Sequence, residues 1–169
     1  MNLRLFTSTL LIVGTLCVLS NTSTALARGL QVNGQGGLSL VPRSSVTIRS
    51  QFDLFSYLEA TTRSGSVLDW MTPQARARFL ASLTFNQNGL TGFQYTDLRA
   101  ELTATQIYQV LSLFGLQRIT PLIAARIVTS EDRAIMQLRS RTLDYVDYWC
   151  SSPHTCTRML GSICVVPGC

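Results

Sequence analysis

The chain has 169 residues, of which 46% are hydrophobic and 14% are charged, and its formal net charge is +5. This length and composition suit a single domain with one core. All 14 cationic residues are arginines, and they are spread along the chain. Because the basic runs that follow a nucleic-acid backbone are missing, we expect no nucleic-acid binding. Only a modest attraction to anionic surfaces follows from the charge.

The first 27 residues have the layout of a secretory signal peptide. Arg4 is an early cation, an apolar run extends from Leu10 to Leu19, and the segment ends in Ala25-Leu26-Ala27. The run is shorter than the roughly 18 apolar residues that a transmembrane anchor needs. We therefore expect cleavage after Ala27, a secreted or periplasmic location, and no stable membrane insertion of the mature protein.

Residues 28–49 are rich in glycine and serine and predict a flexible lead-in, with one short edge strand as an option within 38–48. Helix-start signals then recur from Ser50 onward, including Thr-Pro pairs at Thr72 and Thr120 and a capping box of Thr103 with Gln106. They predict helices over residues 51–63, 73–85, 97–102, 104–114, 121–128 and 131–149. We therefore predict an all-α fold, a bundle of about five to six helices over residues 50–149, with a disulfide-stapled tail over 150–169.

The last predicted helix depends on the spacing of its apolar residues. Steps of three and four residues separate Ile135, Leu138, Thr142, Tyr145 and Trp149. This spacing is typical of one buried helix face. We expect the helix to pack along its whole length and to bring Trp149 and Cys150 to the end of the bundle.

The tail contains four of the five cysteines, Cys150, Cys156, Cys164 and Cys169. Their spacing fits neither a zinc ribbon nor a C-x-x-C redox pair. Removal of Cys17 with the signal peptide leaves an even number in an oxidising compartment, which favours two disulfides. Three pairings are open. We favour Cys150–Cys156 and Cys164–Cys169, because each pair encloses its own turn formers. The alternative is a cysteine metal site completed by His154, but we expect no cofactor.

Three other features bear on binding. The segment FNQNGLTGFQYTD resembles part of a calcium loop, but it has Tyr95 where the bidentate carboxylate is needed, so we interpret it as a helix connection. Arg76 and Arg139 fall on the apolar faces of their predicted helices. Either their stems reach out to water, or each is a buried arginine that pairs with a carboxylate or an anionic partner. Asp132 is the candidate partner of Arg139.

No catalytic frame is recognisable, since His154 is the single histidine and no nucleophile elbow or zinc-binding helix is present. We therefore predict an exported, non-enzymatic interaction protein that presents a stable surface to another protein or to an anionic envelope component. The expected contact residues are Tyr145, Tyr148, Trp149, His154, Arg139 and Arg76. The alternative is a small secreted hydrolase acting on an envelope or extracellular polymer. A membrane-active factor is disfavoured by the dispersed charges.

Overall fold

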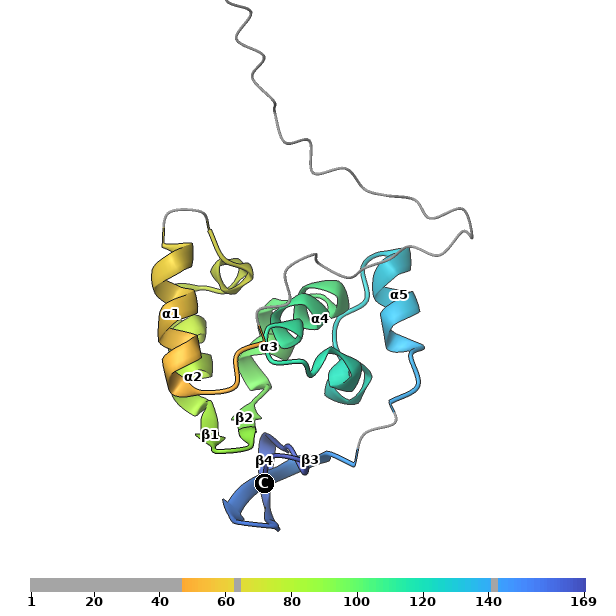
Figure 1. Cartoon of the computed structure of the whole chain (residues 1–169). Coiled ribbons are helices and arrows are strands. Elements are labelled where there is room, and N and C mark those ends of the chain that lie inside the picture. The colour runs from red at the N-terminus through yellow and green to blue at the C-terminus, as the bar shows by residue number, and fades with distance from the viewer. Residues whose placement is uncertain (1–46, 63–64, 141–142) are drawn as a thin grey trace, which may run out of the picture. The chain divides into compact units, whose positions relative to one another are not determined.

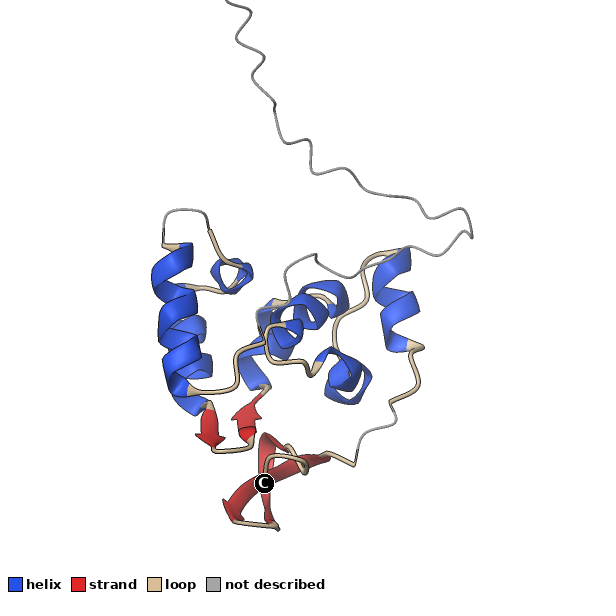
Figure 2. Cartoon of the chain, viewed as in Figure 1, coloured by secondary structure: helices blue, strands red, loops and turns tan. Residues whose placement is uncertain are grey.

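The computed structural model describes residues 47–62, 65–140 and 143–169, so the predicted signal peptide and most of the lead-in lie outside the described residues. Within these ranges the chain forms both helices and strands (Figures 1 and 2). The helices are α1 (Gln51–Thr61), η1 (Val67–Trp70), α2 (Pro73–Ser82), α3 (Thr96–Glu101), α4 (Ala104–Ser112), η2 (Gln117–Ile123) and α5 (Ser130–Met136), where η1 and η2 are 3-10 helices. The strands are β1 (Thr84–Asn86), β2 (Gly89–Gln94), β3 (Tyr145–Ser152) and β4 (Thr155–Cys164).

The prediction of an all-α bundle is wrong. The four strands form one antiparallel sheet of order β1-β2-β4-β3, and Figure 2 shows these strands in red beside the blue helices. Helix η1 was also missed, and Thr120-Pro121 does not start a helix, because Pro121 lies inside η2. The fold is mixed α/β.

The helix starts predicted from capping are confirmed where the cap is local. Ser50 accepts a hydrogen bond from the Asp53 amide at 3.1 Å, and Thr72 accepts one from Ala75 at 3.3 Å. At α4 the capping box of Thr103 and Gln106 is reciprocal. Each cap satisfies N–H groups that the helix itself cannot pair, which explains why these boundaries could be predicted from sequence.

The predicted helix over 131–149 is wrong in its second half. α5 ends at Met136, and the residues from Tyr145 onward form β3. Asp147 has a φ of 64°, which an α-helix does not allow. Tyrosine, valine and tryptophan are residues that strands favour, and here pairing with β4 decides their conformation.

The segment interpreted as a helix connection is a β-hairpin. β1 and β2 pair with Asn86 opposite Gly89, so that a two-residue loop joins them. Asn86 accepts a hydrogen bond from the Asn88 amide at 2.8 Å, and Gly89 has a φ of 122°. The loop is Gln87 and Asn88, and Gly89 is the first residue of β2. An Asn-Gly pair is a short-range hairpin signal, and Asn88-Gly89 is present in the sequence.

One hydrophobic core joins the helices to the sheet. The ring of Phe79 in α2 lies edge-on to Phe93 in β2 and to Phe114, with centroids 6.1 and 6.3 Å apart. Ile48 enters the same core, and its amide donates to the Leu113 carbonyl at 2.7 Å. Burial of such aromatic rings dominates the energy of a core this small. Among the described helices, none has the length and apolar character needed to cross a membrane.

Candidate functional site

Two disulfides hold the C-terminal region, and they join Cys150 to Cys169 and Cys156 to Cys164. The expectation of two disulfides is confirmed, but the favoured pairing is wrong. Cys150 and Cys156 do lie opposite each other across the β3–β4 hairpin. Cys150 nevertheless bonds to Cys169, because the chain after β4 returns to the hairpin end, where the His154 amide donates to the Cys169 carbonyl at 2.7 Å. Cys156 bonds to Cys164 within β4.

The β3–β4 hairpin is folded back on itself. Cys156 and Cys164 belong to the same strand, yet their Cα atoms are 5.9 Å apart, whereas an extended strand would separate residues eight positions apart by about 26 Å. The bend is at Asp147 in β3 and Gly161 in β4, which both have positive φ. The pairing register is interrupted at the same place, between Val146 and Tyr148. This β-bulge bends the hairpin.

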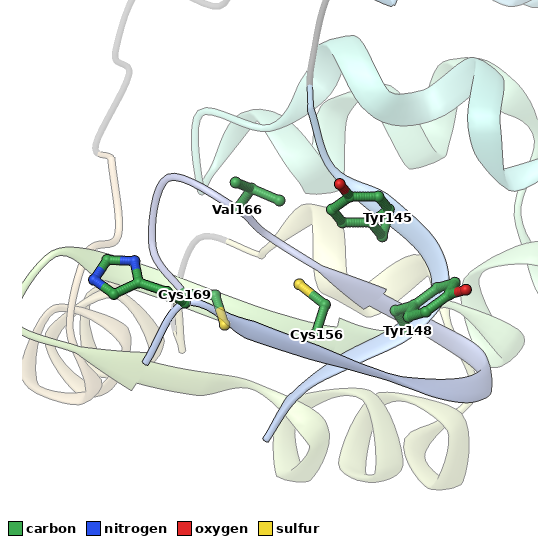
Figure 3. A pocket seen from close by; sticks show the side chains of 6 residues that line it. Tyr145, Tyr148, Cys156, Val166 and Cys169 are labelled. Atoms are coloured by element: carbon green, nitrogen blue, oxygen red, sulfur yellow. The ribbon is translucent and has the colours of Figure 1, made fainter. Parts of the chain in front are cut away.

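The folded-back hairpin surrounds a groove of about 350 Å³ (Figure 3). Its lining residues are Tyr145, Tyr148, His154, Cys156, Val166 and Cys169. In a regular strand, residues three apart point to opposite faces. The bulge at Asp147 resets this alternation, and the rings of Tyr145 and Tyr148 lie 5.6 Å apart at a tilt of 53°. The groove therefore has an aromatic wall and a sulfur-containing wall.

A partly buried network of side chains lies at the bend that shapes the groove. Asp147 accepts hydrogen bonds from the Tyr95 hydroxyl at 2.7 Å and from the Gly161 amide at 2.8 Å. Arg99 lies 5.5 Å from the centroid of the Tyr95 ring, within the range of a cation–π interaction. These contacts tie the start of α3 to the bend.

The fold shifts the pKa values of Asp147 and Tyr95 in opposite directions. The Gly161 amide first, and the Tyr95 hydroxyl second, hold the pKa of Asp147 below its usual range. Burial first, and the bond to Asp147 second, raise the pKa of Tyr95. The charged carboxylate and the neutral phenol are therefore both favoured by the fold.

The remaining predicted contact residues lie apart from the groove. Trp149 is half-buried and lies opposite Thr157 in the register of β3 and β4. Its neighbour Tyr148 lines the groove. Because neighbouring residues of a strand point to opposite faces, Trp149 projects from the other face of the hairpin. Arg76 is half-buried and pairs with Asp69 beside a separate, more open depression of about 500 Å³. Arg139 is exposed beyond the end of α5, so the alternative of a buried arginine is wrong there.

Asp132, the candidate partner of Arg139, is bound by backbone instead. Its side chain is fully buried and accepts hydrogen bonds from the amides of Thr105 at 2.7 Å and of Val128 and Thr129 at 2.9 Å. Burial alone would raise the pKa of this carboxyl, but the hydrogen bonds, led by that from Thr105, hold the pKa well below its usual range. Asp132 thereby joins the start of α4 to the start of α5, which is a structural role.

The sulfur atoms are the described groups most suited to a metal. The Sγ atoms of Cys150, Cys164 and Cys169 lie within 4.8 Å of one another. His154 does not belong to this group, so the alternative of a metal site completed by His154 has no support in the geometry. Metal binding requires cysteine thiolates, whereas all four cysteines are paired in disulfides.

Comparisons with known proteins find no match for this chain to a protein-family model, to a curated protein or to a solved structure. The groove and its surroundings are therefore the basis for a functional assignment.

Sequence reasoning identified three groove residues, Tyr145, Tyr148 and His154, but it placed the two tyrosines on a helix. The sequence does not reveal the pair at the bend, because Tyr95 enters it only at a calcium-ligand position and no local pattern marks Asp147. Gly92 and Gly161 are the sequence features that come closest to indicating the bend, because a glycine within a strand often marks a bulge or the close approach of another backbone. That signal does not identify the partner.

Proposed function

We propose that this protein is an exported, non-enzymatic binding protein whose contact surface is the groove on the β3–β4 hairpin. The observation that carries the proposal is the gathering of Tyr145, Tyr148 and His154 around one groove. Tyr145 is 53% exposed although it is a large aromatic residue. Exposed aromatic side chains held by a rigid frame lose little conformational freedom on binding, which is why tyrosine is enriched at binding hot spots.

The frame of this groove is stable for physical reasons. The two disulfides connect the hairpin end to the C-terminal residue and hold β4 in its bend. Preorganisation of this kind lowers the entropy cost of association. The preferred partner is another protein that presents an apolar or aromatic side chain to the groove, and an anionic envelope component is the alternative.

The use of the carboxylates weighs against the hydrolase alternative. Seven of the nine carboxylates accept hydrogen bonds that build the fold, and these are Asp53, Asp69, Asp97, Glu101, Asp132, Asp144 and Asp147. A glycosidase-type mechanism needs two carboxylates on either side of a scissile bond. The groove has none among its lining residues.

The proposed location follows from the signal-peptide layout of residues 1–27 and is compatible with the disulfides, which persist in oxidising compartments. The intact mass of the protein recovered from the source cells tests it. We expect a chain that begins at Arg28 and contains no free thiol. A retained leader would contradict export with cleavage.

Binding is tested by affinity capture with the oxidised protein, followed by titration of the purified partner. We expect the double change Tyr145→Ala, Tyr148→Ala to weaken binding at least about tenfold, as loss of a hot spot does. The matched control is Phe52→Ala, Phe55→Ala on α1, whose side chains are 76% and 57% exposed. Equal losses in both variants would contradict the groove as the contact surface. Turnover of an envelope polymer without a partner would favour the hydrolase.

A further inference from the structure

Cysteines of the two disulfides lie beside each other in the folded protein, and the Sγ atoms of Cys150, Cys164 and Cys169 form one cluster. Cys150 and Cys156 are opposite each other in the register of the β3–β4 hairpin, and they belong to different disulfides. The Sγ atoms of Cys164 and Cys169, which also belong to different disulfides, lie within 4.8 Å of each other. The structure therefore places both cysteine pairs of an alternative connectivity beside each other, Cys150 and Cys156 by strand register and Cys164 and Cys169 by the distance between their sulfur atoms.

The groove gives a small molecule access to this cluster. Cys156 and Cys169, one from each disulfide, are among its lining residues (Figure 3). Its volume of about 350 Å³ is within the range of small-molecule sites. Cys156 is partly exposed and Cys169 is 5% exposed, and a thiolate that entered the groove would lie beside a cysteine of either bond.

We propose that the groove is a thiol-exchange site, at which a low-molecular-weight monothiol converts the pairs Cys150–Cys169 and Cys156–Cys164 into Cys150–Cys156 and Cys164–Cys169. The conversion needs no net oxidant, because two disulfides are present before and after. It does not depend on the binding function proposed above.

The exchange proceeds in three balanced steps, each an attack of a thiolate on a disulfide sulfur. The monothiolate attacks Sγ of Cys169 and forms a mixed disulfide, and the Cys150 thiolate leaves. Cys150 then attacks Sγ of its cross-strand neighbour Cys156, and the Cys164 thiolate leaves. Cys164 finally attacks Sγ of Cys169, closes the second bond and releases the monothiolate.

The exchange would change the shape of the groove. The bond between Cys156 and Cys164 holds two distant positions of β4 within 5.9 Å. In the product neither new bond spans the bend of β4, so the bend would depend on the Asp147 network alone. A small thiol would thereby loosen the covalent frame of the groove without leaving free cysteines behind.

Tryptic mapping distinguishes the two connectivities, because Arg158 lies between Cys156 and Cys164. Cleavage there separates a peptide with Cys150 and Cys156 from a peptide with Cys164 and Cys169. In the starting protein both disulfides link these peptides, and in the proposed product each peptide carries its own bond. The experiment incubates the native protein with a substoichiometric amount of reduced glutathione, blocks free thiols by alkylation, and digests the unfolded chain.

We expect the linked pair to decline while two separate, internally bridged peptides accumulate, with no increase in free thiol. A linked pair that persists, or that yields only glutathione adducts and alkylated cysteines, would refute the proposal. A ratio of separate to linked peptides equal to that obtained in denaturant would also refute it, because exchange would then proceed through unfolded chains.

The control variant is Cys156→Ser, Cys164→Ser, which keeps the Cys150–Cys169 bond. Its two peptides should stay linked under the same conditions, since the variant has no second disulfide that the Cys150 thiolate could attack. Separation of the peptides to the same extent as in the parent protein would show simple reduction and would contradict exchange.

Discussion

The hydroxyl of Tyr95 donates a 2.7 Å hydrogen bond to the carboxylate of Asp147, which lies 52 residues later in the sequence. Tyr95 is 4% exposed and immediately precedes α3, whereas Asp147 occupies the bulge of β3. This bond connects the helical part of the fold to the bend of the hairpin. The shape of the groove therefore depends on a contact with a residue outside the C-terminal region.

Loss of this hydroxyl should destabilise the fold measurably. We expect Tyr95→Phe to lower the free energy of unfolding by about 1.5 kcal/mol, since the bond is to a charged group. The control is Tyr57→Phe, whose hydroxyl bonds to the neutral Ser66 hydroxyl at 2.9 Å and should cost about 0.5 to 1 kcal/mol. Chemical denaturation of the oxidised proteins measures both values. Indistinguishable losses would contradict a special role of the bond to Asp147.

The same pair predicts a pH dependence at both ends of the scale. The pKa of Asp147 is lowered in the fold, so its contribution to stability is present above the usual carboxyl pKa and is lost as the pH falls below it. The pKa of Tyr95 is raised, so its contribution is present below the usual tyrosine pKa and is lost as the pH rises through the raised value. The stability difference between the parent protein and Tyr95→Phe should therefore be largest near neutral pH and should shrink toward both extremes. A pH-independent difference in denaturation experiments would contradict this.

Asp132 should be the most sensitive carboxylate of the helical part. Replacement of the buried Asp132 by Ala removes the acceptor of three backbone amides, and we expect a loss of about 3 kcal/mol or more. Because the pKa of Asp132 is lowered, the stability that it contributes is lost as the pH falls below the usual carboxyl range. The control Glu131→Gln changes the exposed neighbour and should cost less than about 0.5 kcal/mol. Thermal and urea unfolding at neutral and acid pH would measure both effects, and equal losses would refute the role of Asp132.

Arg139 should behave as an ordinary surface residue. Its side chain is exposed, and the carboxylate considered as its partner is bound by backbone amides. We expect Arg139→Ala to change the free energy of unfolding by less than about 0.5 kcal/mol. A loss comparable to that of Asp132→Ala, measured under the same conditions, would show that the two residues are coupled.

Gly161 should tolerate no side chain. A Cβ atom there would lie 2.5 Å from the Thr96 hydroxyl oxygen, in addition to the cost of its φ of 79°. Gly65 has the same φ but open space around its Cβ position. We expect Gly65→Ala to cost about 1 kcal/mol from the backbone alone and Gly161→Ala to cost clearly more. The double variant Thr96→Ala, Gly161→Ala should recover part of the stability that Gly161→Ala loses beyond the loss of Gly65→Ala. If no stability were recovered, the overlap with Thr96 would not be the cause.

The two disulfides should contribute unequally to stability. Their loops have sequence separations of 19 and 8 residues. The chain-entropy relation predicts that loss of either bond costs about 3 kcal/mol, with Cys150–Cys169 the larger by about 0.7 kcal/mol. Unfolding of the two paired Cys→Ser variants measures the difference. A larger loss for Cys156–Cys164 would show that the bend of β4 contributes beyond loop entropy.

The sequence by itself determined the features that depend on neighbouring residues. Helices start at Ser50, Thr72 and Thr103, because the side-chain oxygen of each accepts a hydrogen bond from the amide three residues later, whatever the rest of the chain does. The even number of cysteines after the signal peptide predicted two disulfides for an equally simple chemical reason. Asn88-Gly89 also carried a local hairpin signal, and it was misread.

The tertiary structure alone decided the features that need a distant partner. Residues from Tyr145 to Trp149 carry the spacing of a helix face, yet they form a strand because β4 supplies their hydrogen bonds. The sheet joins β2 to β4, whose pairing of Phe93 with Ile163 no local pattern encodes. The cysteine pairing follows from this topology, because the fold-back at Gly161 brings Cys156 to Cys164. A strand satisfies its backbone only through another strand, so its existence, its bend and the groove that it surrounds are properties of the assembled fold.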